Sequence, residues 1–183
     1  MKTLVLVLAT LIFSSTLVAQ TVDDLTFLTE HYPPFNFEED EKLQGIAVES
    51  LREMFKLVDT DKTIQDVKLW PWARGYSRVL DTKNTVLFST ARTEAREKLS
   101  KWVGPVAPSH IVVLAKKSRG AKVDSIQDLH KYRIGVVRDD IGEQLLLQMG
   151  VRKGNIHQTI SGICAASTVS DILASFIRWM VGT

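Results

Sequence analysis

Residues 89–96 combine two hydroxyl side chains with two arginines, directly after the short apolar run 86–88. Side-chain hydroxyls, backbone N–H groups at the start of a turn and a planar guanidinium are the donors with which proteins bind a carboxylate. The candidate anion-binding residues of this segment are Ser89, Thr90, Arg92 and Arg96. A second interpretation stays open, because Ser and Thr are ordinary N-cap residues and arginines four positions apart often lie on a solvated face.

A scaffold of alternating strands and helices is predicted around this segment. Apolar and polar residues alternate over 25–30, whereas Val48, Leu51 and Phe55 recur at helical spacing. The predicted order is strand 25–30, helix 47–58, strand 67–70, helix 72–80 and strand 86–88. Such alternation indicates helices packed on a largely parallel sheet, with ligands bound where the carboxyl ends of the strands open into loops.

These three strands end in polar or aromatic side chains. They are Glu30 and Tyr32 after the first strand, Trp70 at the end of the second, and Ser89 and Thr90 after the third. Because the carboxyl ends of parallel strands meet at one edge of a sheet, we predict a ligand site there. Two simpler roles stay open: Trp70 is an ordinary core tryptophan, or Glu30 simply pairs with Arg74.

A second alternation begins after the apolar strand predicted at 111–115. The polar stretch 116–122 is a candidate crossing into a second lobe. The predicted elements beyond it are a capped helix start at 125–128, strand 133–137, helix 141–149 and strand 155–160. The sequence therefore predicts an α/β chain divided into a first lobe at 21–112, part of a second lobe at 113–160 and an atypical tail at 161–183.

Residues 1–20 have the pattern of a cleavable secretory signal peptide. Lys2 provides the positive start, 4–13 form an apolar run too short to span a bilayer comfortably, and 14–19 are mostly small residues. We expect cleavage near Ala19 or Gln20 and export of the mature chain.

Composition excludes several other classes of function. The formal net charge is only +2, and no basic stripe with interleaved aromatic residues is present, so we expect no nucleic-acid binding. The four histidines, His31, His110, His130 and His157, show no metal-ligand spacing. Cys164 is the only cysteine, which excludes an internal disulfide.

Five segments resemble the family 3 extracellular solute-binding proteins, the periplasmic amino-acid-binding type. These segments are 30–35, 45–49, 89–96, 102–105 and 134–137, and the resemblance extends over about 25–160. It implies two α/β lobes of the type II periplasmic binding protein kind, joined by a hinge and closing on a small ligand. It also implies a periplasmic monomer that needs no cofactor and has an inner-membrane ABC permease as partner.

The resemblance assigns roles to residues on both lobes. Arg96 matches the arginine that clamps the ligand α-carboxylate and is favoured over Arg92, for which Glu94 or Glu97 could be a partner instead. Ser89 falls near hydroxyl and backbone contacts of the ligand, with Thr90 beside it. Tyr32 and Phe35 match an aromatic loop that covers the ligand, although Phe35 is equally suited to packing. On the second lobe, Asp139 falls where the family presents backbone N–H groups and a short polar side chain.

The C-terminal part departs from the family. Members are longer, so the first lobe is expected to be complete and the second incomplete. Beyond residue 161 the sequence resembles nothing expected there, although Leu173, Phe176 and Ile177 have a spacing that would allow an amphipathic helix. We expect a truncation or frameshift near codon 161. A neighbouring reading frame that encodes a family-like Gly-x-Asp segment would support this.

The leading hypothesis is a periplasmic binding protein for a polar amino acid or similar small carboxylate, serving ABC-type transport. A second hypothesis is an enzyme on the same scaffold, such as a cyclohexadienyl dehydratase, which needs a positioned acid or base. His31 is the only histidine near the predicted cleft. A third hypothesis is a ligand-sensing module that reports to a membrane partner, and a fourth is a shortened chain without activity.

Overall fold

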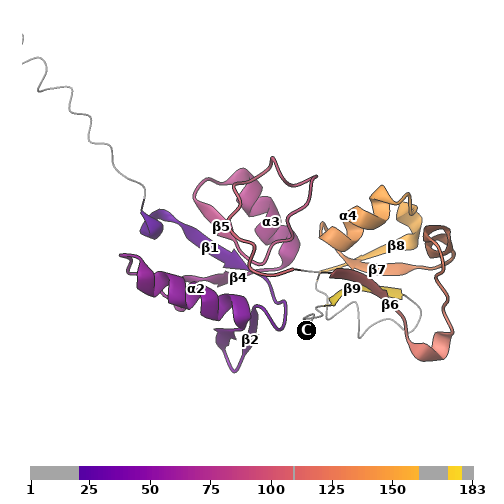
Figure 1. Cartoon of the computed structure of the whole chain (residues 1–183), viewed down its shortest axis with the longest axis horizontal. Coiled ribbons are helices and arrows are strands. Elements are labelled where there is room, and N and C mark those ends of the chain that lie inside the picture. Colours follow the sequence, from indigo (N-terminus) through magenta and orange to yellow (C-terminus); the bar gives the residue numbers. More distant parts are fainter. Residues whose placement is uncertain (1–20, 109, 161–172, 179–183) are drawn as a thin grey trace, which may run out of the picture.

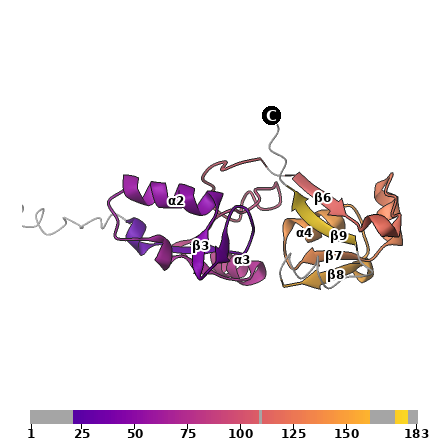
Figure 2. The same cartoon turned by 90° about the horizontal axis from the view of Figure 1, so that it is seen from below.

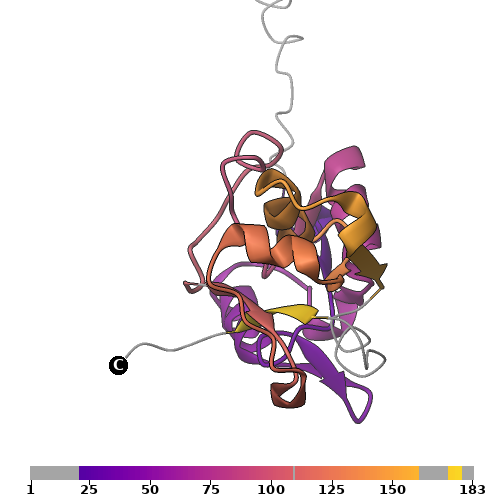
Figure 3. The same cartoon turned by 90° about the vertical axis from the view of Figure 1, so that its right-hand side faces the viewer.

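A computed structural model describes residues 21–108, 110–160 and 173–178, which form two α/β lobes side by side (Figure 1). The predicted signal peptide, Cys164 and most of the atypical tail lie outside the described residues. Seen along the long axis of the molecule, the second lobe lies in front of the first (Figure 3).

The first lobe is built on a three-stranded parallel sheet with the order β4-β1-β5. Its strands and helices are β1 (Thr26–Thr29), α2 (Ile46–Leu57), β4 (Lys68–Leu69), α3 (Trp72–Asp81) and β5 (Thr85–Leu87). Helices α2 and α3 lie on opposite faces of this sheet (Figure 2). This confirms the predicted order of strands and helices, and it brings the carboxyl ends of the three strands to one edge.

The core of the first lobe follows the apolar spacing of α2. Val48, Leu51 and Phe55 are buried against Phe27 of β1, and Ile64 closes the cluster. The rings of Phe27 and Phe55 meet edge to face with centroids 5.0 Å apart. Burial of each such side chain contributes about 1.5–3 kcal/mol, which is enough to fix α2 on the sheet.

The loop after β1 is held against the start of α2. The carbonyl oxygens of Pro34 and Phe35 accept hydrogen bonds from the backbone N–H groups of Ile46 and Ala47, at 3.1 and 2.9 Å. Gly45 makes this approach possible, because it has φ 123° and an added Cβ would lie 2.3 Å from the Phe35 carbonyl oxygen. This loop, residues 31–35 and called the proline-aromatic loop below, is therefore a fixed part of the lobe.

A hairpin that the sequence did not predict follows this loop. It consists of β2 (Phe37–Glu39) and β3 (Lys42–Gln44), paired antiparallel. The turn between them places Asp40 and Glu41 at φ 50° and 58°. Two positive φ values in succession are the twist that a two-residue hairpin needs.

The second lobe contains a four-stranded mixed sheet with the order β6-β9-β7-β8. Its strands and α-helix are β6 (His110–Leu114), β7 (Ile134–Val137), α4 (Ile141–Gln148), β8 (Ile156–Thr159) and β9 (Leu173–Arg178). Buried Ile134 and Val136 of β7 pack with Leu146 of α4, Leu129 and Val151. Five short 3₁₀ helices complete the described elements of the chain: Val22–Asp24, Ile64–Asp66, Lys117–Arg119, Ile126–Lys131 and Lys153–Asn155.

Strand β9 corrects an expectation for the tail. The helix allowed by the spacing of Leu173, Phe176 and Ile177 is wrong, because Leu173–Arg178 is a strand, antiparallel to β6 and parallel to β7. The pairing supplies hydrogen-bond partners to the facing edges of both neighbours, which outweighs a helical periodicity of only a few residues.

The predicted lobe boundary between residues 112 and 113 falls inside β6. All of His110–Leu114 pairs with β9 in the second sheet. The strand predicted at 111–115 is also less buried than its apolar sequence indicates, since Val113 and Leu114 are 37% and 42% exposed.

Candidate functional site

Arg96 lies where the two lobes meet and is only 1% exposed. Its Nη1 donates to the carbonyl oxygen of Ala91 at 3.3 Å, and its Nη2 donates to the carbonyl oxygen of Asp139 in the second lobe at 3.1 Å. The guanidinium carbon lies 5.1 Å from the ring centroid of Trp72 and 4.7 Å from that of Tyr76. Position 96 thus faces the second lobe.

The buried guanidinium is only partly satisfied by its neighbours. Burial of a cation is costly unless hydrogen bonds and nearby charge compensate it, and two carbonyls and two aromatic faces do so here. A guanidinium carries five N–H donors, and the Nε of Arg96 has no hydrogen-bond partner among the described residues. Arg96 therefore has donor capacity left for an anion.

Two hydroxyl groups in the same segment are also buried without a hydrogen-bond partner among the described residues. Ser89 Oγ and Thr93 Oγ1 are buried and have no hydrogen-bond partner in the part of the chain that the structure describes. Each buried, unpaired polar group costs about 1–3 kcal/mol. The sequence singled out Ser89, whereas Thr93 was missed although it begins the Thr-x-x-Arg spacing that ends at Arg96. Residues 89–96 thus contain three buried donors that have no partner among the described residues.

The backbone of Asp139 connects the second lobe to this site. Its carbonyl oxygen accepts hydrogen bonds from Arg96, from Trp72 Nε1 at 3.0 Å and from Gln144 Nε2 at 3.4 Å. Its N–H donates to Glu143 Oε2 at 2.7 Å, and its φ is 60°. Asp139, predicted as a ligand contact, joins the lobes through its carbonyl. Trp72 and Glu143, which fix that carbonyl, were not predicted.

Two carboxyl groups share the electrostatic environment of Arg96. Burial raises the pKa of Glu30 to about 8, with the nearby Asp140 adding to the increase and Arg96 opposing it. Burial also raises the pKa of Asp140 above its ordinary value, again against the effect of Arg96. Burial and the same two carboxyl groups raise the pKa of Tyr32 as well. Glu30 is therefore largely protonated at neutral pH.

The aromatic candidates have well-defined partners. Tyr32 and Phe35 stack with centroids 5.5 Å apart and an interplanar angle of 21°, and Phe35 is 4% exposed. The guanidinium of Arg74 lies 3.9 Å from the ring centroid of Trp70. Phe35 thus packs inside the loop that Tyr32 begins, and this burial is what a packing role requires. The contact of Arg74 is with the ring of Trp70.

The remaining candidates, Thr90 and Arg92, make local contacts. Thr90 Oγ1 donates to the carbonyl oxygen of Leu87 at 2.8 Å. Arg92 Nε donates to Glu97 Oε2 at 2.7 Å, and the Arg92 side chain is 57% exposed. This pair is one of the two partnerships that the sequence left open for Arg92.

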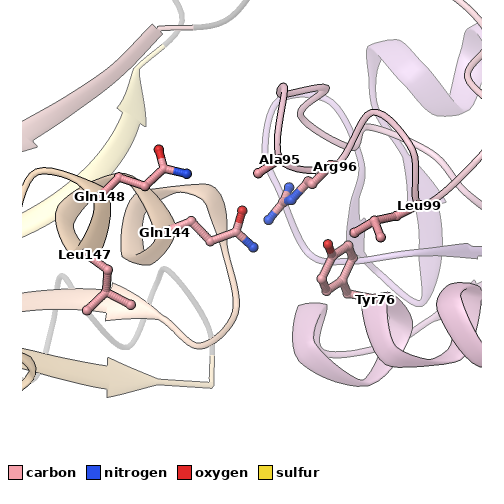
Figure 4. A pocket seen from close by; sticks show the side chains of 7 residues that line it. All are labelled: Tyr76, Ala95, Arg96, Leu99, Gln144, Leu147 and Gln148. Atoms are coloured by element: carbon pink, nitrogen blue, oxygen red, sulfur yellow. The ribbon is translucent and has the colours of Figure 1, made fainter.

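A cavity of about 280 Å³ opens beside Arg96 between the lobes. Its lining consists of Tyr76, Ala95, Arg96 and Leu99 from the first lobe and Gln144, Leu147 and Gln148 from α4 (Figure 4). Arg96 is the only charged residue of this lining.

The described residues contain no group of three or more His, Cys, Asp or Glu side chains that could hold a metal ion. Among the same residues, every helix is too short or too polar to cross a membrane.

No protein-family model and no curated protein matches the sequence, but several solved structures match the fold. The arginine-, lysine-, histidine-binding protein ArtJ from Geobacillus stearothermophilus superposes with a TM-score of 0.70 at 16% identity, over 84% of this chain and 67% of that protein. EhuB in complex with hydroxyectoine gives 0.69 at 15% identity, over 84% and 63%.

The ancestral amino acid-binding protein AncCDT-1, a precursor of cyclohexadienyl dehydratase, gives a TM-score of 0.67 at 18% identity, over 87% of this chain and 75% of that protein. The chain thus spans roughly two thirds of the length of these proteins. Its two α/β lobes have the type II periplasmic binding protein fold, which is the fold implied by its resemblance to the family 3 solute-binding proteins.

Proposed function

We propose that this protein is a solute-binding protein that captures an amino acid or similar small carboxylate between its lobes. The observation that carries the proposal is Arg96, buried where the lobes meet and with an Nε that has no partner among the described residues. A carboxylate is the planar anion that a guanidinium fork binds in two-point fashion.

Affinity would come from charge-assisted hydrogen bonds in a partly buried site. Beside Arg96, the hydroxyls of Ser89 and Thr93, which have no partner within the described ranges, are suited to donate to the same carboxylate. Proteins of the same fold are described as binding arginine, lysine and histidine or hydroxyectoine, which supports a small polar ligand. We further propose a periplasmic location after removal of residues 1–20, and delivery of the ligand to an ABC permease.

Calorimetric titration of the chain without its signal peptide against a panel of amino acids and small hydroxy acids tests this function. Arg96→Ala should abolish carboxylate binding, whereas Arg92→Ala, which removes an exposed arginine of the same segment, should leave the dissociation constant within about twofold. Equal affinity of Arg96→Ala and the parent chain would refute the proposal.

A dehydratase acting on a cyclohexadienyl carboxylate is a second candidate, because Glu30 has the properties of a general acid. With a pKa of about 8, its carboxyl group carries a proton at neutral pH and lies within electrostatic reach of Arg96. Arg96 would hold a substrate carboxylate while Glu30 protonates the ring hydroxyl, whose C–O bond breaks so that it departs as water. The carboxyl group on the ring leaves at the same time as CO₂, and the electron pair of the broken C–C bond completes the aromatic ring. Incubation with a prephenate-like compound should then give the aromatic product, with Glu30→Gln inactive. An unchanged substrate spectrum after prolonged incubation would exclude this activity.

A further inference from the structure

Two hydrogen bonds from the first lobe end on one backbone oxygen of the second lobe. Arg96 Nη2 and Trp72 Nε1 both donate to the carbonyl oxygen of Asp139, at 3.1 and 3.0 Å, and we call this pair of hydrogen bonds the Asp139 contact. Arg96 also borders the cavity of about 280 Å³ between the lobes (Figure 4), so the lobes are not tightly packed here. A polar, loosely packed contact permits the two lobes to separate.

One carboxyl group from each lobe lies at this contact. Glu30 follows β1 directly, and its backbone carbonyl accepts a hydrogen bond from Asn36 Nδ2 at 2.6 Å. Asp140 follows Asp139 directly and is the N-cap residue of α4. The carboxyl groups of Glu30 and Asp140 lie within electrostatic reach of each other and of Arg96. The Asp139 contact therefore brings two groups of like charge together across the lobes.

Among the described residues, Arg96 is the cation that faces this pair. The other titratable groups around the pair are Tyr32, from the proline-aromatic loop, and Glu143, from α4. When Glu30 and Asp140 are both ionised, their charge exceeds that of the single guanidinium, and Glu143 repels Asp140 further. One proton on the pair balances the charge of Arg96.

We propose that the contact between the lobes is a pH-sensitive switch: the lobes stay joined while Glu30 and Asp140 share a proton, and they separate when both are ionised. In the joined arrangement, one Nη of Arg96 is taken up by the Asp139 carbonyl oxygen. Separation frees this donor and exposes the guanidinium to the solvent. The switch operates in the chain without ligand, so the inference goes beyond the proposed function.

The direction of the pH dependence follows from burial and from the proximity of the two groups. Burial raises the pKa of Glu30 from 4.5 to about 8, with Asp140 adding to the increase and Arg96 opposing it, and burial also raises the pKa of Asp140. Since the two groups interact, the retained proton belongs to the pair. Separation exposes both groups to water and returns each pKa toward its ordinary value. The joined state is thus fully favoured below pH 4.5, and this advantage is lost as the pH rises toward 8.

The distance between two spin labels, one on each lobe, measures this separation directly. Cys164→Ser removes the native thiol, and Lys83→Cys and Gln127→Cys place the labels at exposed positions of the first and second lobes. In the chain without signal peptide and without ligand, the ratio of joined to separated molecules should fall by about tenfold or more between pH 5 and pH 8.

Glu30→Gln and Asp140→Asn, which lie on opposite lobes, should each reduce this change to less than about twofold, because either amide removes the repulsion within the pair. Asparagine is also a favourable N-cap residue, so Asp140→Asn preserves the start of α4. The double variant should behave like each single variant, since both changes remove the same pairwise interaction. Asp124→Asn is the matched control, because it removes the same charge at an exposed position of the second lobe, and it should separate with pH as the parent does.

A label distance that stays constant with pH in the parent chain would overturn the switch. Variants Glu30→Gln and Asp140→Asn that separate with pH as strongly as the parent would overturn it as well. Because no ligand is added, either result leaves the proposed function standing. The proposed function fails separately, if Arg96→Ala binds carboxylates as tightly as the parent chain.

Discussion

Arg96 Nη2 donates a hydrogen bond to the carbonyl oxygen of Asp139 at 3.1 Å, across 43 positions of sequence and from one lobe to the other. The same carbonyl accepts from Trp72, so two side chains of the first lobe converge on one backbone oxygen of the second. The carboxylate of the proposed ligand would compete with this oxygen for the guanidinium. Ligand binding and lobe contact would then be coupled through one group.

Replacement of Trp72 by Phe should destabilise the chain, because the change removes the indole N–H that reaches Asp139 and part of a side chain that is 2% exposed. We expect a loss of about 1–3 kcal/mol in the free energy of unfolding, measured by urea titration. Trp102→Phe is the control, since it removes a similar hydrogen bond, to Glu97, at a more exposed position. An equal loss in both variants would contradict a special role for the contact between the lobes.

Glu30→Gln should change how stability depends on pH. The pKa of Glu30 is raised from 4.5 to about 8 in the folded chain, so between these values the folded state holds a proton that the unfolded state has lost. The contribution of Glu30 to stability is thus fully present below pH 4.5 and falls by up to about 1.4 kcal/mol per pH unit as the pH rises toward 8.

Urea titrations at pH 5, 7 and 9 should therefore show Glu30→Gln gaining stability over the parent as the pH increases. Glu38→Gln, an exposed change in β2, is the control. A difference between Glu30→Gln and parent that stays constant with pH would show that the carboxyl group is not protonated in the folded chain.

Substitution of Gly45 by Ala should detach the proline-aromatic loop from α2. An added Cβ would lie 2.3 Å from the Phe35 carbonyl oxygen, at a φ of 123° that L-residues rarely adopt. We expect a destabilisation of about 2–3 kcal/mol, visible as a lower midpoint of thermal unfolding. Gly154→Ala, where nothing lies within 4 Å of the added atom, should change the midpoint little. Similar midpoints for both variants would contradict the fixed loop.

Replacement of Glu143 by Ala should free the turn that presents the Asp139 carbonyl. Glu143 is 9% exposed, and its carboxylate accepts hydrogen bonds from the Asp139 N–H and from Gln158 Nε2. We expect faster amide hydrogen exchange at Asp139 and weaker ligand binding. Exchange at the α4 amides should stay close to that of the parent. Unchanged exchange at Asp139 would show that other groups hold the turn.

Local sequence patterns were sufficient for most of the first lobe. The spacing of Val48, Leu51 and Phe55 predicted α2 because one apolar helix face is a local property. The β2–β3 hairpin was missed because its short, charged strands have low strand propensity and depend on the turn at Asp40 and Glu41. Strand β9 was missed because its pairing with β6 and β7 is a long-range contact.

In the candidate site, too, local sequence indicated some residues, whereas others are recognised only from long-range contacts in the fold. Residue type and position after a strand indicated Arg92 and Arg96 together, and the preference for Arg96 came from the resemblance to the family 3 proteins. Trp72 was not indicated, because its hydrogen bond to Asp139 spans 67 positions and no local pattern reveals that bond. Pro71 directly before Trp72 marks the start of α3 and was the sequence feature that could have indicated Trp72. The expectation that ligands bind at the carboxyl ends of strands led to Trp70 instead.

Strand β9 lies inside the second sheet, between β6 and β7, although it is the last described element along the chain. The strands of the first lobe are therefore all present once the chain reaches Leu87, whereas the second sheet cannot close until residues 173–178 are also free to pair. In the interval, β6 and β7 expose unpaired edges that a chaperone or another nascent chain can occupy. The order of the strands along the chain thus allows the first lobe to fold before the second.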